Sequence, residues 1–221
     1  CALAIFVLVL LVGWSTPHVA AQVPDPGVPG PRQVIRAEYN LGLVAFTPTN
    51  FPGPVELLAS VHYPIDLSGG PFPLIIFIHG AHNTCFTGSQ SLSEWPCSLT
   101  SPIPNYMGFD YAAELLASHG FIVVSISANG INARDNDSSV PDAGALARAE
   151  LIQKHLDIWR TFNTTGGPPF CNRFVGKVDL QRVGTMGHSR GGEGVVRHFQ
   201  LNQALGSPYG IKAVFPLAPT D

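Results

Sequence analysis

Apolar positions in the first third of this chain follow two different patterns. Residues 33–40 and 55–64 alternate loosely between apolar and polar side chains, which is typical of half-buried strands, and a turn-rich stretch separates them. Residues 73–80 (PLIIFIHG) form a continuous apolar run bounded by Pro and Gly, as expected for a strand covered on both faces. The chain is therefore predicted to enter a sheet through an antiparallel pair and to continue into a parallel region.

Helical spacing then alternates with further apolar runs. Helices are predicted at residues 108–120, 142–162 and 191–205, and strands follow each of them at 121–129, 181–187 and 211–219. The first helix is predicted to bury Tyr111, Leu115 and Leu116. The second is predicted to bury Leu146, Leu151, Ile152, Leu156 and Trp159. Residues 129–144 are predicted to be a surface loop, and no second domain is expected.

Repeated strand–helix–strand units define the fold class. They predict an α/β fold with an open, mostly parallel, doubly wound sheet and helices on both faces. In such sheets ligands bind beyond the carboxyl ends of the strands, where both the HG of 79–80 and the GHSRGG of 187–192 fall.

Composition narrows the class of protein. The 221 residues are 45% hydrophobic and 12% charged, which suffices for one sizeable domain and argues against disorder. The formal net charge is −3, and no basic run is interleaved with aromatic residues, so nucleic acid is not an expected partner.

The first 32 residues read as export and leader segments. An apolar stretch over 1–14 and small residues at Val19 and Ala21 predict a signal peptide over 1–21, incomplete at its start because no charged region precedes it. A membrane anchor is the alternative, but the run is short and Pro17 follows it. Residues 22–32 are predicted to be a Pro/Gly-rich leader and 33–221 the folded domain. The protein is expected to be secreted, extracellular or periplasmic, with no stable membrane insertion after cleavage.

Export predicts an oxidising environment for the cysteines. The mature chain keeps Cys85, Cys97 and Cys171, an odd number. Cys85 and Cys97 bracket a polar loop that a bridge would stiffen, so they are predicted to form a disulfide. Two buried free thiols are the alternative, and the partner of Cys171 is not predictable.

One serine stands among four glycines where a strand gives way to a helix. Gly187, Ser189 and Gly191 match G-x-S-x-G, with a strand expected before and a helix after. The glycines would let strand and helix approach closely, so that the turn exposes the hydroxyl as a nucleophile. A glycine-rich turn in which the serine only caps the helix is the alternative.

Backbone N–H groups near this serine would bind the negative charge of an acyl-transfer intermediate. Arg190 is predicted to supply one N–H and Ala81 the second, with His82 in reserve, because Gly80 lets the loop bend tightly. An ordinary turn at the strand end is the alternative reading of the Gly80 segment.

With these motifs the sequence resembles the α/β-hydrolase superfamily from about residue 33 to the end. GHSRGG and APTD are most similar to secreted cutinase-like polyester hydrolases and to relatives of platelet-activating-factor acetylhydrolase, dienelactone hydrolase and chlorophyllase. Two departures weigh against polyester specificity. Arg190 stands where cutinase-like enzymes carry an apolar residue, and a cysteine-bearing insertion follows the oxyanion strand.

The resemblance also implies an acid and a histidine, in that order, after the nucleophile. His198 lies on the serine's own helix and His188 precedes the serine, so neither is expected to act as the base. Asp221 aligns with an aspartate that precedes the acid of the relatives, and Glu193 is expected to pair with Arg190 or Arg197. The catalytic Asp and His, with the last strands, are therefore predicted to lie beyond Asp221, and a chain ending there is expected to have little activity.

The function predicted from these features is a secreted serine hydrolase acting on carboxylic esters, as an esterase, lipase or cutinase-like enzyme, through a Ser189 acyl-enzyme. A small-molecule, lipid or polyester ester is the expected partner. No cofactor and no metal are expected, because His79, His82 and His155 lack the spacing of a ligand set. A non-catalytic binding protein, or an acyltransferase or peptidase on the same scaffold, are the alternatives. Phe86, Trp95, Tyr106 and Phe109 are candidate pocket walls. The oligomeric state is not predictable.

Overall fold

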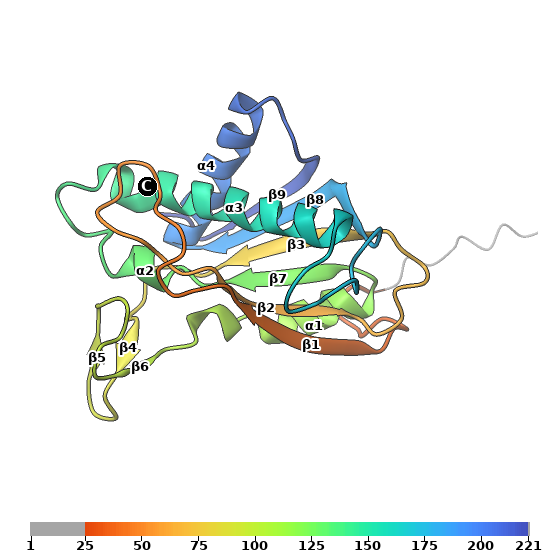
Figure 1. Ribbon diagram of the computed structural model, residues 1–221, viewed down its shortest axis with the longest axis horizontal. Helices are drawn as coiled ribbons and strands as arrows, with labels where there is room; N and C mark the ends of the chain where they lie inside the picture. Colours follow the sequence, from red (N-terminus) through yellow and green to blue (C-terminus); the bar gives the residue numbers. More distant parts are fainter. Residues whose placement is uncertain (1–24, 221) are drawn as a thin grey trace, which may run out of the picture.

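A six-stranded mixed sheet forms the centre of the molecule, as the computed structural model of residues 25–220 shows (Figure 1). The strand order is β1-β2-β7-β3-β8-β9. The strands are β1 (Val34–Asn40), β2 (Leu58–Pro64), β3 (Phe72–Ile78), β7 (Ile122–Ile126), β8 (Val178–His188) and β9 (Ile211–Leu217). β2 is antiparallel to both β1 and β7, whereas the pairs β7/β3, β3/β8 and β8/β9 are parallel. The antiparallel entry and the parallel continuation are both confirmed.

Helices cover both faces of this sheet. α1 (Asp110–Ser118) lies against one face, and α3 (Ala145–Thr164) and α4 (Arg190–Ala204) pack together on the other (Figure 1). The larger hydrophobic cluster lies under α3 and includes Trp159, Leu151 and Val195. A smaller cluster under α1 joins Phe77, Ala113 and Met186. The predicted α/β class with helices on both faces is therefore confirmed.

The burial of α1 differs from the prediction, because Leu115 and Leu116 are only half-buried and Tyr111 is exposed. Tyr111 is 74% exposed, whereas Ala113 and Ala117 are fully buried against the sheet. The small alanines bring the helix close to β2 and β7, and this orientation turns Tyr111 away from the sheet. Helical spacing alone did not show which of the apolar positions would face the core.

Residues 129–144 are only partly the surface loop that the sequence predicted, since residues 133–140 form turns with 136–139 exposed, whereas the two ends are helical. α2 (Asn129–Asn132) is entirely buried, and η2 (Pro141–Gly144), a 3-10 turn, leads into α3. The buried carboxylate of Glu56 accepts hydrogen bonds from the N–H groups of Asn129 and Gly130 at 2.6 and 2.9 Å. A carboxylate that satisfies helix N–H groups stabilises the short helix in the interior.

The segment between β3 and α1 forms a flap with its own small sheet. Its strands β4 (Cys85–Phe86), β5 (Ser91–Leu92) and β6 (Ser101–Pro102) pair in the order β5-β4-β6, and the 3-10 turn η1 (Asn105–Met107) follows. Cys85 and Cys97 form a disulfide in this flap, as predicted. Cys171 is exposed.

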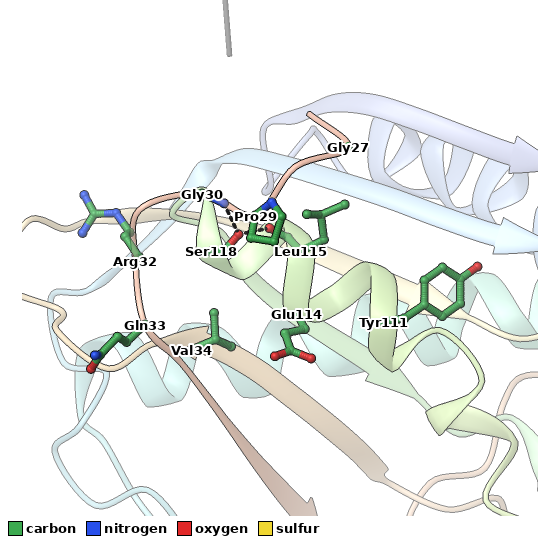
Figure 2. Close-up of a pocket in the computed structure, with 10 residues that line it drawn as sticks. All are labelled: Gly27, Pro29, Gly30, Arg32, Gln33, Val34, Tyr111, Glu114, Leu115 and Ser118. Carbon is green, nitrogen blue, oxygen red and sulfur yellow. Dashed lines mark hydrogen bonds between the residues drawn. The ribbon is translucent and has the colours of Figure 1, made fainter. Parts of the chain in front are cut away.

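The leader residues closest to β1 lie against the end of α1. The N–H of Gly30 donates to Ser118 Oγ at 2.7 Å (Figure 2). The N–H of Arg32 donates to the Ser118 carbonyl at 3.1 Å. A cavity of about 560 Å³ lies between this segment and α1. Because Ser118 precedes β7, the cavity is at the amino edge of the parallel strands, opposite the edge where Ser189 follows β8. The predicted signal peptide, residues 1–21, lies outside the described residues.

Candidate active site

Ser189 occupies the sharp turn between β8 and α4. Its φ of 53° and ψ of −125° lie in a region that residues with a side chain rarely adopt. Such a conformation costs about 1–3 kcal/mol and persists only where surrounding contacts fix it. Here the Ser189 N–H donates to the Leu217 carbonyl at 2.9 Å, and the Ser189 carbonyl accepts from the Gly192 N–H at 2.7 Å. The turn is thus held by β9 on one side and by the first turn of α4 on the other.

Glycines on both sides of the serine allow this turn to form. A Cβ at Gly187 would overlap the carbonyl oxygen of Gly191, and a Cβ at Gly192 would lie 3.0 Å from the Gly187 carbonyl oxygen. Gly191 has a different neighbour, since its Cβ would lie 2.7 Å from the carbonyl oxygens of both Ile78 and His79. The glycines therefore bring α4 against β8 and also against the end of β3.

The end of β3 lies beside the serine. In the parallel pairing of β3 with β8, Ile78 is opposite Gly187, so the continuation of the two strands sets Gly80 next to Ser189. A Cβ at Gly80 would lie 3.0 Å from Ser189 Cβ and 2.9 Å from the His188 carbonyl oxygen. Only a residue without a side chain fits there. The serine turn and the Gly80–Ala81 turn are therefore in contact.

Hydrogen bonds fix the peptide group that joins Gly80 to Ala81. The Gly80 carbonyl oxygen accepts from His79 Nδ1 at 2.8 Å and from Asn132 Nδ2 at 2.9 Å. His79 Nε2 accepts from the Ala128 N–H at 2.9 Å, so Nδ1 carries the proton of a neutral ring. Burial lowers the pKa of His79 to about 3, in agreement with a neutral ring. Because a trans peptide directs its C=O and N–H oppositely, the Ala81 N–H points away from these buried donors.

The two predicted oxyanion donors have no acceptor within the described part of the chain. Neither the Ala81 N–H nor the Arg190 N–H donates to a group of residues 25–220. Ala81 is exposed, and Arg190 opens α4, where free N–H groups and the helix dipole favour negative charge. Two N–H groups that flank an accessible serine could stabilise an oxyanion.

The side chain of Arg190 is held by Asp135 and Asn136. Arg190 Nη1 lies 2.8 Å from Asp135 Oδ1, and Nη2 donates to Asn136 Oδ1 at 3.0 Å. Glu193 was expected to pair with Arg190 or Arg197. It instead accepts a hydrogen bond from Thr220 Oγ1 at 3.4 Å, while Arg190 pairs with Asp135 and Arg197 donates to Gln200 Oε1.

No side chain of residues 25–220 hydrogen-bonds the Ser189 hydroxyl. His198 is a packing residue that is fully buried on α4, where its Nε2 lies 3.1 Å from Gln153 Oε1. The ring of His188 stacks instead on His82 with 6.5 Å between ring centroids. Burial and the charge of His188 lower the pKa of His82. Asp221 lies outside the described residues.

The candidate aromatic walls are distributed over several places. Trp95 is buried and donates from Nε1 to the Leu43 carbonyl at 2.9 Å, and Tyr106 is buried with its hydroxyl on Glu38. Phe109 packs on Phe77, on the face of the sheet that α1 covers. Phe86 is 46% exposed on the flap, and Phe109 is half-buried.

Residues 25–220 contain no group of three or more His, Cys, Asp or Glu side chains able to hold a metal ion. Within the same range no helix is long and apolar enough to span a membrane.

Sequence reasoning missed the buried polar residues behind the site. Arg148 and Asp135 form a fully buried ion pair with 2.6 Å between Nη2 and Oδ2, and Arg148 also donates to Asn132 Oδ1 at 2.7 Å. Arg148 stands on the apolar face of α3 with Ile152, Leu156 and Trp159. A charged residue on such a face signals a buried partner, and this signal could have led to Asp135.

The sheet, the helices on its two faces and the serine between β8 and α4 define an α/β-hydrolase. The comparison with family models gives the more specific assignment, because the PET hydrolase-like model matches residues 103–221, more than half of the chain. The chain belongs to the PET hydrolase-like family. No curated protein matches the sequence.

Proposed function

We propose that the protein is a secreted serine hydrolase that cleaves carboxylic esters through an acyl-enzyme on Ser189. The observation that carries this proposal is the contact between two turns. The serine has a positive φ at the β8–α4 junction and lies directly beside Gly80–Ala81 at the end of β3. Membership of the PET hydrolase-like family supports ester hydrolysis as the reaction.

In the proposed reaction Ser189 Oγ attacks the ester carbonyl carbon as a base removes its proton. The carbonyl π electrons move to oxygen, and the N–H groups of Ala81 and Arg190 stabilise the resulting oxyanion. Collapse of the tetrahedral intermediate breaks the bond to the leaving oxygen, which takes the proton and departs as an alcohol. Water then repeats the sequence on the acyl-enzyme and releases the acid. We place the general base and its orienting carboxylate outside residues 25–220.

Polyesters and simpler esters are cleaved by the same chemistry. Membership of the PET hydrolase-like family favours esters of this kind as the substrate class. Arg190, which departs from the cutinase-like pattern, directs its guanidinium to Asp135 and Asn136 and not toward the serine. The charge of Arg190 is therefore paired within the protein and is no argument against an ester substrate. Secretion is supported by the Cys85–Cys97 disulfide, since such bridges persist in oxidising compartments.

Release of p-nitrophenol from short and medium acyl esters by the full-length protein tests the proposal. Ser189→Ala is expected to abolish turnover. Ser207→Ala is the matched control, because Ser207 is an exposed serine that also has a positive φ, 57°, but follows the far end of α4. Equal rates for wild type and Ser189→Ala would refute the proposed function.

A further inference from the structure

A buried polar cluster connects the segments that carry the two predicted oxyanion donors. Its members are Asn132, Asp135 and Arg148, whose side chains are buried and come from α2, the segment after it, and α3. Arg148 Nη2 lies 2.6 Å from Asp135 Oδ2 and donates to Asn132 Oδ1 at 2.7 Å. Nη1 of the same guanidinium donates to the Ala143 carbonyl at 2.9 Å. The guanidinium therefore fixes both neighbouring side chains.

One arm of the cluster reaches the Ala81 side of the site. Arg148 can only donate, so the Asn132 oxygen must face it and the Asn132 amide nitrogen must face the other way. That nitrogen donates to the Gly80 carbonyl at 2.9 Å. Gly80 and Ala81 share one peptide group, so the bond to the carbonyl also sets the direction of the Ala81 N–H.

The second arm reaches the serine turn. Asp135 Oδ1, the oxygen that does not face Arg148, lies 2.8 Å from Arg190 Nη1. Arg190 is the first residue of α4 and follows Ser189, so this ion pair holds the residue that carries the second donor. The Arg148–Asp135 ion pair thus connects to the Ala81 N–H through Asn132 and to the Arg190 N–H through the Arg190 side chain.

We propose that Asn132 and Asp135, held by Arg148, are positioning residues that fix the Ala81 and Arg190 N–H groups for the oxyanion. This proposal rests on the proposed function, because it assigns these N–H groups a role in ester hydrolysis. The three residues touch no substrate. They act by holding the donors in place before the reaction, and such preorganisation strengthens binding of the transition state more than binding of the substrate.

Asn132→Asp is the most direct variant. Aspartate has nearly the same shape and still accepts from Arg148, but an ionised carboxylate cannot donate to the Gly80 carbonyl. Removing a direct oxyanion donor lowers kcat by about 100- to 1000-fold, so loss of a positioning bond is expected to lower it by about 10- to 100-fold. KM is expected to stay within about twofold, since the donors contribute mainly to the transition state.

Asn202→Asp provides the matched control. Asn202 is also a buried asparagine, and its Nδ2 donates to a backbone carbonyl, that of Tyr209, at 3.0 Å, but at the far end of α4. If Asn132 is merely structural, both variants lose thermal stability and keep kcat per folded molecule. The inhibition constant of an alkyl boronic acid, whose tetrahedral adduct places an oxygen in the oxyanion hole, is expected to rise with Asn132→Asp and not with Asn202→Asp.

Arg190→Gln tests the other arm at a partly exposed side chain, and Asp135 keeps its buried partner Arg148 in this variant. It is expected to lower kcat by about 10-fold or more, again with little change in KM. Wild-type kcat in folded Asn132→Asp would overturn the proposal, and if that variant does not fold, wild-type kcat in Arg190→Gln would do so. Ser189→Ala is assayed alongside. If it is inactive while these variants are fully active, the positioning role fails and the proposed function stands; if Ser189→Ala is itself active, the function fails.

Discussion

Gly191 lies so close to His79 that a Cβ at the glycine would be 2.7 Å from the His79 carbonyl oxygen. The first turn of α4, which follows Ser189, therefore contacts the end of β3 through backbone atoms alone. This contact, and not only the turn at Ser189, brings the serine to the loop of Ala81. Gly191, the last residue of G-x-S-x-G, is therefore needed for the packing of α4 against β3 as well as for the serine turn.

Gly191→Ala is accordingly expected to push α4 away from β3. Real Cβ atoms essentially never lie so close to backbone oxygens, and overpacking of this kind costs about 1–3 kcal/mol. The variant is expected to unfold at lower denaturant concentration and to lose most of its esterase activity. Urea unfolding and p-nitrophenyl ester turnover measure the two effects.

Gly184→Ala is the control for this prediction. Gly184 lies in β8, before the serine turn, and a Cβ there would meet only the Ile75 side chain, at 3.6 Å, which is ordinary contact. Its stability and activity are expected to stay near those of wild type. Equal behaviour of the two alanine variants would contradict the close approach of α4 to β3.

The elements that could be predicted from sequence are those set by local pattern. The apolar run of residues 73–80 predicted the parallel strand β3, and the serine with its glycines predicted the β8–α4 turn. α2 was missed because it depends on Glu56, which is more than 70 residues away in the chain. The ion pair of Arg190 with Asp135 and the bond from Asn132 to Gly80 also join residues far apart in the chain. Local patterns thus predicted the candidate nucleophile and its turn but not the residues that hold their surroundings.

Breaking the buried ion pair is expected to destabilise the protein strongly. Arg148→Met leaves Asp135 buried without its main partner, and such changes cost about 3–5 kcal/mol. Arg160→Met is the control on the same helix, because the Arg160–Asp157 pair is largely exposed and is expected to contribute less than about 1 kcal/mol. Chemical denaturation measures both variants. A loss with Arg148→Met no larger than that with Arg160→Met would contradict the burial of the pair.

The flap disulfide is expected to stabilise its own segment. A bridge across a sequence separation of 12 residues contributes about 3 kcal/mol in the chain-entropy account. The double variant Cys85→Ala, Cys97→Ala is therefore expected to unfold at lower temperature, and limited proteolysis is expected to cut it first between residues 86 and 101. Cys171→Ala, at an exposed cysteine, is expected to leave both measurements unchanged. Wild-type resistance of the flap in the double variant would refute this role.

Buried histidines predict loss of stability in acid. Burial lowers the pKa of His155 to about 3 and that of His198 to about 4, whereas an unfolded histidine titrates near 6.5. Below about pH 6.5 the unfolded chain binds protons that the folded chain does not, so stability falls as the pH is lowered toward 4. Each histidine contributes up to about 1.4 kcal/mol per pH unit in that window.

Urea unfolding at pH 7.5, 6, 5 and 4.5 measures this dependence. His198→Gln keeps a polar group beside Gln153 but cannot take up a proton, so its stability is expected to fall less steeply with acid than that of wild type. Identical slopes in the two proteins would show that His198 is protonated in the folded state.

Mass spectrometry of the protein treated with a fluorophosphonate tests the central claim most directly. This reagent forms a stable phosphonyl ester with a serine whose hydroxyl is activated and whose oxyanion donors are in place. The account predicts a single adduct on the full-length protein, mapped to the peptide that contains Ser189. Labelling of another serine, or no adduct while esters are hydrolysed, would contradict it.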